Sequence, residues 1–189
     1  MSYLVQDVPG LQYIPDYISS NEHDQLLSTI DAQPWLADLK RRVQHYGYRY
    51  DYKSRAVHSN ACLGPLPAWV VPLAECLHCD GLIEVVPDQV IVNEYQPGQG
   101  IASHVDCIPC FGDTIISLSL GSPCVMIYTR IGDGYEVPIL LEQRSLVVMQ
   151  GEARHRWKHG ILKQKTDMYK GQVIRRGRRV SVTFRKIIV

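Results

Sequence analysis

The sequence predicts a mainly β fold with flanking helices, of the β-sandwich or jelly-roll type. The first observation is that, from residue 89 onward, the chain reads as a series of short apolar or alternating segments bounded by turn residues. The second is that the helical patterns lie before this series, in the amino-terminal part. Many short strands beside a few helices are typical of a sandwich or jelly roll buttressed by helices.

Clusters of glycine, proline, serine and aspartate separate the expected strands. These turn signals are Pro97-Gly98, Gly112-Asp113, Gly121-Ser122-Pro123 and Gly132-Asp133-Gly134. We therefore expect strands at 89–95, 101–105, 114–120, 124–129, 136–142, 145–149 and 179–188.

The amino-terminal part is expected to contribute an extended segment at 11–18 and two helices. Ser19 and Glu22 have the spacing of a capping box, which marks the start of the first helix. The apolar stripe of this helix consists of Leu26, Leu27 and Ile30. The second helix is expected over 66–79.

Residues 43–53 read as an extended ribbon rich in tyrosine. Its period of two would place Tyr46, Tyr48, Tyr50 and Tyr52 on one face, with Gly47, Arg49, Asp51 and Lys53 on the other. An ordinary half-buried strand explains this pattern. Tyrosine and arginine are also the residues that stack on nucleobases and pair with phosphates.

Composition favours one globular domain. The chain has 189 residues, of which 46% are hydrophobic and 21% charged, so disorder and coiled coil are disfavoured. We see no basic start followed by an apolar run, and no apolar stretch of the roughly 18 residues that a membrane helix needs. We therefore expect a cytoplasmic protein that is not associated with a membrane.

The net charge of +1 conceals an uneven distribution. Residues 36–56 hold six Lys/Arg and two acids, and residues 153–186 hold twelve Lys/Arg and one acid. Such polarity predicts an anionic partner on one face, with solvated surface charge as the alternative.

Six cysteines include two pairs with C-x-x-C spacing, Cys76/Cys79 and Cys107/Cys110. Because no secretory signal is visible, we expect reduced thiols rather than a disulfide framework. A structural zinc site is the less favoured alternative. For the second pair three interpretations stay open: inert thiols, zinc ligands, or oxidised thiols.

His104-Val105-Asp106 lies at the end of an expected strand, where a spacing of two puts both side chains on one face. With a second histidine, this pair would complete the 2-His-1-carboxylate set that binds ferrous iron and leaves positions open. Two distal histidines are candidates, His155 and His159.

The last expected strand alternates Arg179, Ser181, Thr183 and Arg185 with apolar residues. Two fixed guanidinium groups are what a small dicarboxylate needs at its two ends. The apolar alternation disfavours a simple cationic surface, because those residues fill the other face.

Four ordered motifs together resemble the AlkB-like Fe(II)/2-oxoglutarate dioxygenases. They are Asn93-x-Tyr95, His104-x-Asp106, His159 in WKHGI, and Arg179-x-Ser181-x-Thr183-x-Arg185. The resemblance covers roughly 89–188, with a weaker similarity in GLQYIPDYIS and RRVQHYGYRYDY.

The resemblance implies a double-stranded β-helix with Fe(II) at its mouth and 2-oxoglutarate and O2 as the other cofactors. The implied iron ligands are His104, Asp106 and His159. His159 is preferred over His155 because the family places its distal histidine before a Gly-Ile or similar pair. Arg179 with Tyr95 would hold the distal carboxylate of 2-oxoglutarate, and Arg185 with Asn93 would lie near its iron-chelating end.

It also implies one dioxygenase domain over 1–189. Residues 1–85 would form an extension that carries a nucleotide-recognition lid near 37–56, and residues 86–189 would form the core. Candidate substrate-binding residues are Tyr46, Tyr48, Arg49 and Trp69, with Trp157 as a further aromatic candidate.

The implied activity is oxidation of alkyl groups, N-methyl groups above all, on nucleobases of DNA or RNA, which releases formaldehyde, succinate and CO2. The substrate base must be single-stranded or flipped out, and a monomer is favoured. Alternatives are a tRNA nucleoside hydroxylase, a protein or small-molecule hydroxylase, a non-catalytic nucleic-acid-binding module, and a cupin-type metal protein using His155.

One departure from the repair-type pattern bears on the substrate. No acidic residue follows Asp106 until Asp113, whereas alkylation-repair members usually carry acids directly after this motif. The run looks more like the branches that act on RNA, including tRNA wobble uridines.

Overall fold

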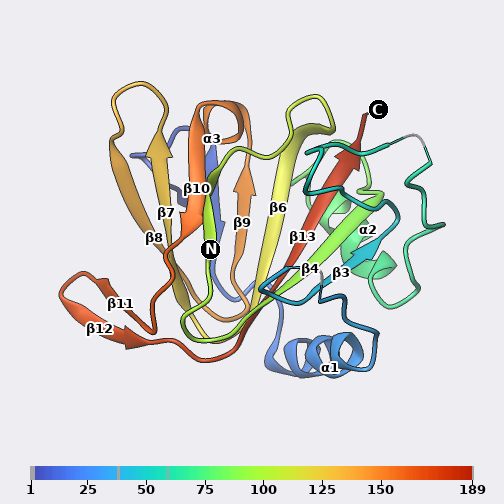
Figure 1. Ribbon diagram of the computed structural model, residues 1–189, viewed down its shortest axis with the longest axis horizontal. Helices are drawn as coiled ribbons and strands as arrows, with labels where there is room; N and C mark the ends of the chain where they lie inside the picture. Colours follow the sequence, from blue (N-terminus) through green and yellow to red (C-terminus); the bar gives the residue numbers. More distant parts are fainter. Residues whose placement is uncertain (1–2, 38, 59, 189) are drawn as a thin grey trace.

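The computed structural model describes residues 3–37, 39–58 and 60–188, and two antiparallel β-sheets face each other in it (Figure 1). The larger sheet runs in the order β1 (Tyr3–Leu4), β2 (Leu11–Ile14), β9 (Leu146–Met149), β6 (Phe111–Gly121), β13 (Arg179–Ile187), β4 (Gln89–Tyr95) and β3 (Val43–Tyr46). The smaller sheet runs in the order β5 (Ile101–His104), β10 (Trp157–Ile161), β7 (Cys124–Arg130) and β8 (Glu136–Leu141). A separate hairpin, β11 (Thr166–Tyr169) and β12 (Gln172–Arg175), projects at the lower left of Figure 1.

This architecture confirms the mainly β jelly roll, a double-stranded β-helix. The strands expected from residue 89 onward are all present, and β4 has the expected bounds. β10 and the β11–β12 hairpin were not expected from the sequence.

In the described part of the chain, two helices cover the outer face of the larger sheet (Figure 1). They are α1 (Ser20–Asp31) and α2 (Val71–Cys79), and the short α3 (Gly151–His155) precedes β10. The capping box of α1 is confirmed, because the Ser19 side chain and the Glu22 side chain each bond to the other residue's backbone N–H. Ile30 of α1 and Leu77 of α2 pack with the outward side chains of the sheet in one buried cluster.

β13 lies between β4 and β6 and separates two chemically different faces. Its alternating Val180, Val182 and Phe184 belong to the cluster under the helices. The residues between them point to the other face, toward the smaller sheet, so Arg179 and Arg185 are buried in the interior rather than placed on a solvated surface.

The ribbon expected over 43–53 ends at Tyr46, because Gly47 interrupts it. Gly47 has a positive φ of 76°, and a Cβ there would overlap the carbonyl oxygen of Asp88. The four tyrosines therefore do not share one face. Tyr46 packs under α2, whereas Tyr48 and Tyr50 pack in the core cluster between the sheets.

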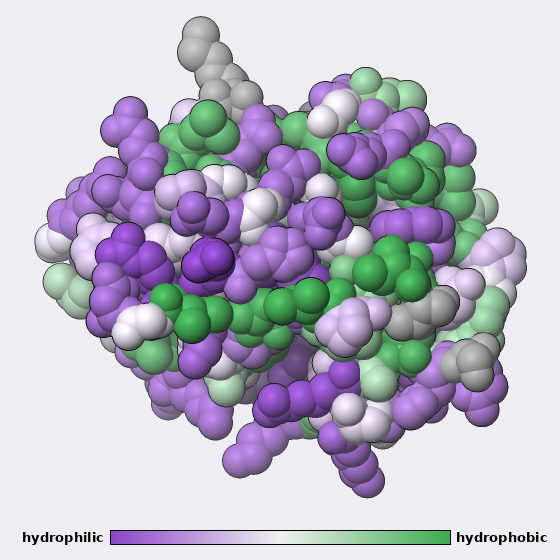
Figure 2. All heavy atoms as spheres, turned by 90° about the horizontal axis from the view of Figure 1, so that it is seen from above, coloured by the Kyte–Doolittle hydropathy of each residue, from purple (hydrophilic) through white to green (hydrophobic). Residues whose placement is uncertain are grey.

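The amino-terminal strands are part of the larger sheet. β1 and β2 extend it beside β9, and β3 extends it beside β4. The face seen from above is mostly hydrophilic, with a band of hydrophobic residues across it (Figure 2). Within the described residues, no helix is long and apolar enough to cross a membrane.

Candidate metal centre and cofactor pocket

Two histidines of the smaller sheet face each other across neighbouring strands. His104 ends β5 and pairs with His159 of β10, and their ring centroids lie 4.5 Å apart. Asp106 follows on the loop that leaves β5. The ligand atoms of these three residues all lie within 4.8 Å of one another, and they form the one potential metal-binding group found among the described residues.

The carboxylate of Asp106 is buried and held from two sides. Its Oδ1 accepts a hydrogen bond from Nη2 of Arg185 at 2.6 Å, and its Oδ2 lies 3.7 Å from Nε2 of His159. Burial opposes the charged form, but the positive charge of Arg185, followed by other cationic neighbours, outweighs it and lowers the pKa of Asp106 to about 2. Asp106 is therefore a carboxylate at neutral pH.

Both imidazoles can offer a neutral nitrogen to a metal. Nδ1 of His104 lies 2.8 Å from the carbonyl oxygen of Ala102, which only accepts; in the neutral ring Nδ1 therefore carries the proton and Nε2 keeps its lone pair. Burial lowers the pKa of His159 to about 4, against the attraction of Asp106, so His159 is neutral as well. Two imidazoles and one carboxylate suit ferrous iron with open positions.

An interior cavity of about 50 Å³ adjoins these three side chains. Its polar lining includes Asn93, Tyr95, Ser181, Thr183, Arg179 and Arg185. Nη2 of Arg179 donates to Oγ of Ser119 at 2.9 Å, but the Nε atoms of Arg179 and Arg185 have no hydrogen-bond partner. Buried donors without acceptors are costly, so these two atoms indicate a place for an anionic ligand. A dicarboxylate such as 2-oxoglutarate fits this cavity chemically.

Tyr128 was not selected from the sequence, yet it faces the same interior. It pairs with His159 across β7 and β10, and the two rings lie 6.0 Å apart. The side chain is fully buried, its hydroxyl has no hydrogen-bond partner, and burial raises its pKa. Tyr128 lies two residues after Met126 on β7, so the two side chains share one face of the strand; Met126 lines the cavity, and this spacing was the available sequence signal.

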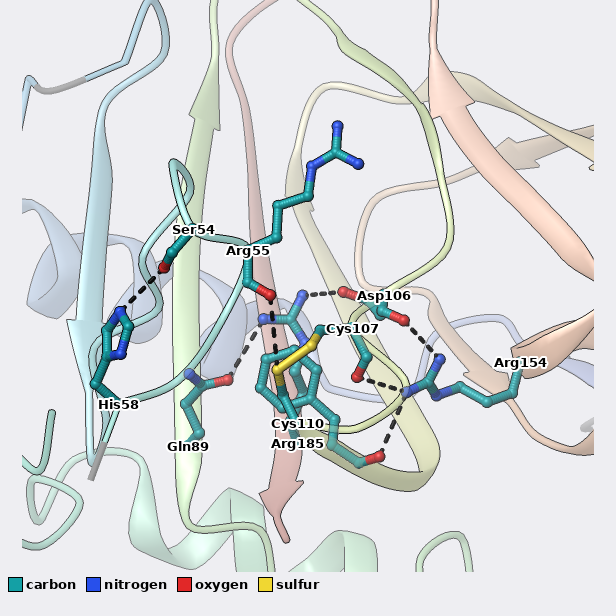
Figure 3. The surroundings of a disulfide bond; sticks show 10 residues. Ser54, Arg55, His58, Gln89, Asp106, Cys107, Cys110, Arg154 and Arg185 are labelled. Atoms are coloured by element: carbon teal, nitrogen blue, oxygen red, sulfur yellow. Dashed lines mark hydrogen bonds and ion pairs between the residues drawn. A yellow bond between two sulfur atoms is a disulfide. The ribbon is translucent and has the colours of Figure 1, made fainter. Parts of the chain in front are cut away.

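Arg154 of α3 supports the loop that carries Asp106. Its guanidinium donates to the carbonyl oxygens of Asp106 at 3.0 Å and Cys107 at 3.2 Å (Figure 3). It also donates to those of Phe111 and Gly112. Sequence analysis missed Arg154 because its hydrogen-bond partners are main-chain carbonyl groups, which no side-chain motif reveals.

Arg41 contacts both the cavity lining and an aromatic groove. Its Nε donates to Oδ1 of Asn93 at 2.9 Å. Its guanidinium also lies 5.6 Å from the ring centroid of Tyr52 and 5.9 Å from that of Tyr95. Arg41 therefore links the cavity residue Asn93 to the partly buried ring of Tyr52.

The expected substrate residues are divided between two places. An open groove of about 830 Å³ is lined by Arg49, together with His45, Tyr50, Tyr52, Lys53 and His58. Tyr46 and Trp69 lie elsewhere, packed edge to face at 5.3 Å in the cluster under the helices. Tyr48 is partly buried against the core, and Trp157 is fully buried.

His155, the alternative distal ligand, does not join the metal-binding group. Its Nε2 contacts Oδ1 of Asp113 at 3.1 Å, and Asp113 is almost fully exposed. His155 is thus placed in a surface pair.

The expectation of six reduced thiols is wrong for one pair, because Cys107 and Cys110 form a disulfide. The turn between them brings their Cα atoms to 5.3 Å, within the range that a disulfide spans. Free thiols are present at Cys62, Cys76, Cys79 and Cys124. No cysteine belongs to a potential metal-binding group among the described residues.

Comparisons with known proteins agree with this geometry. The family model of the 2OG-Fe(II) oxygenase superfamily matches residues 10–185. The chain is 39% identical to the "Alkylated DNA repair protein ALKBH8 homolog" of Arabidopsis thaliana, over 96% of this chain and 59% of that protein. It is also 39% identical to the "tRNA (carboxymethyluridine(34)-5-O)-methyltransferase ALKBH8" of Mus musculus, over 95% of this chain and 30% of that protein.

The comparison with solved structures shows the same fold. The solved structure of OsALKBH1 superposes with a TM-score of 0.70, covering 97% of this chain and 98% of that one, at 17% identity. The chain thus spans about a third to three fifths of the length of the two curated relatives. The superfamily's cofactors are Fe(II), 2-oxoglutarate and O2, and the His-Asp-His group is of the kind that binds such a metal. The chain therefore belongs to the 2OG-Fe(II) oxygenase superfamily, as an AlkB-like dioxygenase.

Proposed function

We propose that this chain oxidises a carbon atom on a modified nucleoside of RNA, and of tRNA in particular. The observation that carries the proposal is that the His104–Asp106–His159 group lines an arginine-rich cavity. Arg41 links this cavity to an aromatic, basic groove, because it contacts Asn93 of the cavity and Tyr52 of the groove. The cavity provides for a dicarboxylate cosubstrate, and the groove provides stacking surfaces and cations. Iron with 2-oxoglutarate and O2 supplies the oxidation of a C–H bond to C–OH, with release of succinate and CO2.

In this proposal His104, Asp106 and His159 hold the iron. Arg179 and Tyr95 bind the distal carboxylate of 2-oxoglutarate, and we add the Tyr128 hydroxyl because it is buried without a partner. The hydroxyl would donate a hydrogen bond to a carboxylate oxygen of the cosubstrate, an acceptor that the protein itself does not provide.

The other end of the cosubstrate has a different environment. Arg185 already donates to Asp106, and the side-chain oxygen of Asn93 already accepts from Arg41. We therefore assign Arg185 mainly to holding Asp106 in place, and the amide nitrogen of Asn93 to the cosubstrate. Arg41 orients that amide.

The groove is where the nucleobase would enter. His45, Tyr50 and Tyr52 line it and contact one another through ring packing, with centroids 5.8 Å apart for His45–Tyr52 and 5.2 Å for Tyr50–Tyr52. Aromatic faces accept any base, so they fit a base that has left its stack. The lid near 37–56 in the expected domain division would supply this wall.

Two further observations favour RNA over DNA. No acid lies between Asp106 and Asp113 to read a damaged base. The name of the mouse relative places that protein's activity on carboxymethyluridine at position 34 of tRNA. A carboxymethyl group offers a CH2 beside a carbonyl as the carbon to be hydroxylated, and the proposed product is the corresponding hydroxylated side chain.

Oxidative removal of N-methyl groups is the second candidate. It is favoured by the name of the Arabidopsis relative, which refers to repair of alkylated DNA. The two reactions share the hydroxylation of a carbon atom and differ in the fate of the new hydroxyl group. A hydroxyl on a carbon-bound side chain stays, whereas a hydroxymethyl group on nitrogen collapses to formaldehyde and the bare base.

The test offers both substrates to one enzyme preparation. Purified protein with Fe(II), ascorbate and 2-oxoglutarate in air receives bulk tRNA or methylated single-stranded DNA, followed by digestion to nucleosides and mass spectrometry. We expect a tRNA nucleoside that is heavier by one oxygen atom, with no formaldehyde.

Asp106→Ala serves as the inactive control, since it removes one proposed ligand. Loss of 1-methyladenine or 3-methylcytosine from the DNA, with formaldehyde, would establish the second candidate instead. Succinate without any altered nucleoside would overturn the assignment to nucleic acids and leave the iron chemistry standing.

A further inference from the structure

The Cys107–Cys110 disulfide closes the turn that leaves Asp106, and the proposed oxidation does not use it. The backbone N–H groups of Cys110 and Phe111 both donate to the carbonyl oxygen of Cys107, each at 3.2 Å. The turn is therefore held by hydrogen bonds as well as by the covalent bond, and it can persist when that bond is broken.

On the metal side, Arg154 fixes the main chain of this turn. It is 2% exposed and donates to the carbonyl oxygens of Asp106, Cys107 and Phe111 (Figure 3). These bonds do not involve either sulfur atom. The backbone that positions Asp106 is thus anchored independently of the disulfide.

On the opposite side, the disulfide contacts the rim of the groove. We use the name rim loop for residues 49–58. Sγ of Cys110, which is 2% exposed, lies 3.8 Å from the carbonyl oxygen of Arg55 in this loop (Figure 3). Val57 and Tyr50 of the rim loop pack in the same core cluster as Cys110. The disulfide is therefore in direct contact with the rim loop.

We propose that Cys107 and Cys110 are a reversible dithiol–disulfide couple, exchanged by thiols of the glutathione class, and that its redox state sets the position of the rim loop. The disulfide form holds the rim loop as the structure shows it, and the dithiol form releases it. Access to the groove changes while the metal-binding group stays in place. The consequence for nucleic-acid binding rests on the proposed function, whereas release of the rim loop does not.

The exchange balances in two steps. A reductant thiolate attacks Sγ of Cys107, the less buried sulfur, and Cys110 leaves as a thiolate. A second reductant thiolate then attacks the reductant sulfur of the mixed disulfide, and Cys107 leaves. Each cysteine thiolate takes up one of the two protons that the reductant thiols lost, so the products are the dithiol and one reductant disulfide.

Steric requirements explain why reduction moves the rim loop. Reduction breaks the bond between the two sulfur atoms, and the two thiol groups then need van der Waals separation, so they move apart. Arg154 holds the main chain at Cys107, and the Arg55 carbonyl blocks Cys110. The rim loop is the less constrained of the two sides and gives way.

The chain contains a matched control for this couple. Cys76 and Cys79 of α2 have the same C-x-x-C spacing, are exposed, and are free thiols. A response to reductant that belongs to Cys107/Cys110 must persist when the α2 pair is replaced.

The experiment is limited trypsin digestion of the metal-free protein in glutathione buffers of increasing reducing strength. Alkylation and mass spectrometry follow the redox state of the Cys107/Cys110 peptide in the same samples. Trypsin cleaves after Lys53 and Arg55, both exposed residues of the rim loop. We expect cleavage there to accelerate about tenfold as the couple becomes reduced, because local opening governs proteolysis of a loop.

The variants fix the origin of the effect. Cys76→Ser/Cys79→Ser should respond like the natural chain, whereas Cys107→Ser/Cys110→Ser should be cleaved fast at every redox potential. Hydrogen exchange of the rim loop in the natural chain gives the same comparison without any variant, should the double replacement fail to fold. In the same buffers, the affinity for Mn(II) with 2-oxoglutarate should change less than about twofold.

Three results would overturn the proposal. One is a Cys107/Cys110 peptide that is alkylated at both cysteines even in oxidised glutathione. Another is equal cleavage and exchange in both redox states. The third is a response that disappears with the α2 cysteines. None of these measurements involves nucleic acid, so their failure is distinct from failure of the proposed RNA substrate.

Discussion

The ring of Tyr128 lies near that of His159, and its hydroxyl is buried with no hydrogen-bond partner in the described structure. The hydroxyl also interacts electrostatically with Arg179. Tyr128→Phe removes only this group. The free energy of unfolding should therefore stay the same or rise by about 1 kcal/mol, because an unsatisfied buried donor is lost. The KM for 2-oxoglutarate should rise about tenfold or more, as expected when a hydrogen bond to a carboxylate disappears. Thermal melts and 2-oxoglutarate titrations of the same preparation measure both.

Tyr46→Phe is the matched control, since its hydroxyl donates to Oε1 of Gln44 outside the cavity. It should leave the KM unchanged. A destabilised Tyr128→Phe protein with an unaltered KM would show that the hydroxyl has a structural partner and no cosubstrate contact.

The parts of the candidate site that could be predicted are those written as side-chain spacings. The H-x-D pair and the alternating arginines follow from the period of two, and the structure brings them together around one cavity. Choosing His159 over His155 needed the family resemblance. Arg154 and Tyr128 were missed because their roles depend on which carbonyls and charges lie across the sheets.

At the scale of elements, Glu94 ties β4 to the segments on both sides of it. Its carboxylate accepts two hydrogen bonds from Arg42, which precedes β3, at 2.6 and 2.8 Å, and one from Arg178, which precedes β13, at 2.6 Å. Arg178 also binds Asp31 at the end of α1. Hydrogen bonding from Arg42, together with that from Arg178, outweighs burial and lowers the pKa of Glu94 from 4.5 to about 2.

Glu94→Gln should therefore destabilise the protein in a pH-dependent way. The pKa in the folded state lies below the value in the unfolded state, so the carboxylate stabilises the fold fully above pH 4.5 and loses this effect as the pH falls to about 2. We expect a loss of about 2 kcal/mol at pH 7, less than the full shift because Arg42 is half exposed.

Urea unfolding at pH 7, 4 and 3 compares the two proteins. The difference between them should narrow progressively toward pH 3. A difference that is constant across this range would mean that the carboxylate charge contributes nothing and that the variant acts through packing.

The elements that sequence analysis missed have weak local patterns. β10 begins directly after α3 and contains Gly160, so its alternation covers only three residues. The β11–β12 hairpin turns at Lys170-Gly171, where both residues have positive φ, a conformation that lysine seldom signals. The ribbon expected over 43–53 was wrong beyond Tyr46, because the sequence keeps its alternation past Gly47, where the chain bends.

At the scale of the whole molecule, only part of the positive charge in residues 153–186 lies at the surface, although the sequence suggested a charged face. Of the twelve Lys/Arg residues in 153–186, six are exposed: Arg156, Lys158, Lys163, Lys165, Lys170 and Arg175. Others hold the interior together, among them Arg154, Arg176 against Asp167, and Arg185 against Asp106. Net charge along a sequence does not separate structural arginines from surface cations, and this limits what it can predict about partners.

The central claim is that His104, Asp106 and His159 form one centre at the cavity between the two sheets, and that this centre consumes 2-oxoglutarate and O2. The most direct measurement is transfer of 18O from 18O2 into succinate, with tRNA present, for the natural chain, His159→Ala and His155→Ala. We predict one labelled oxygen atom in succinate for the natural chain and for His155→Ala, and none for folded His159→Ala. Labelled succinate from His159→Ala, or its loss from His155→Ala alone, would contradict the account.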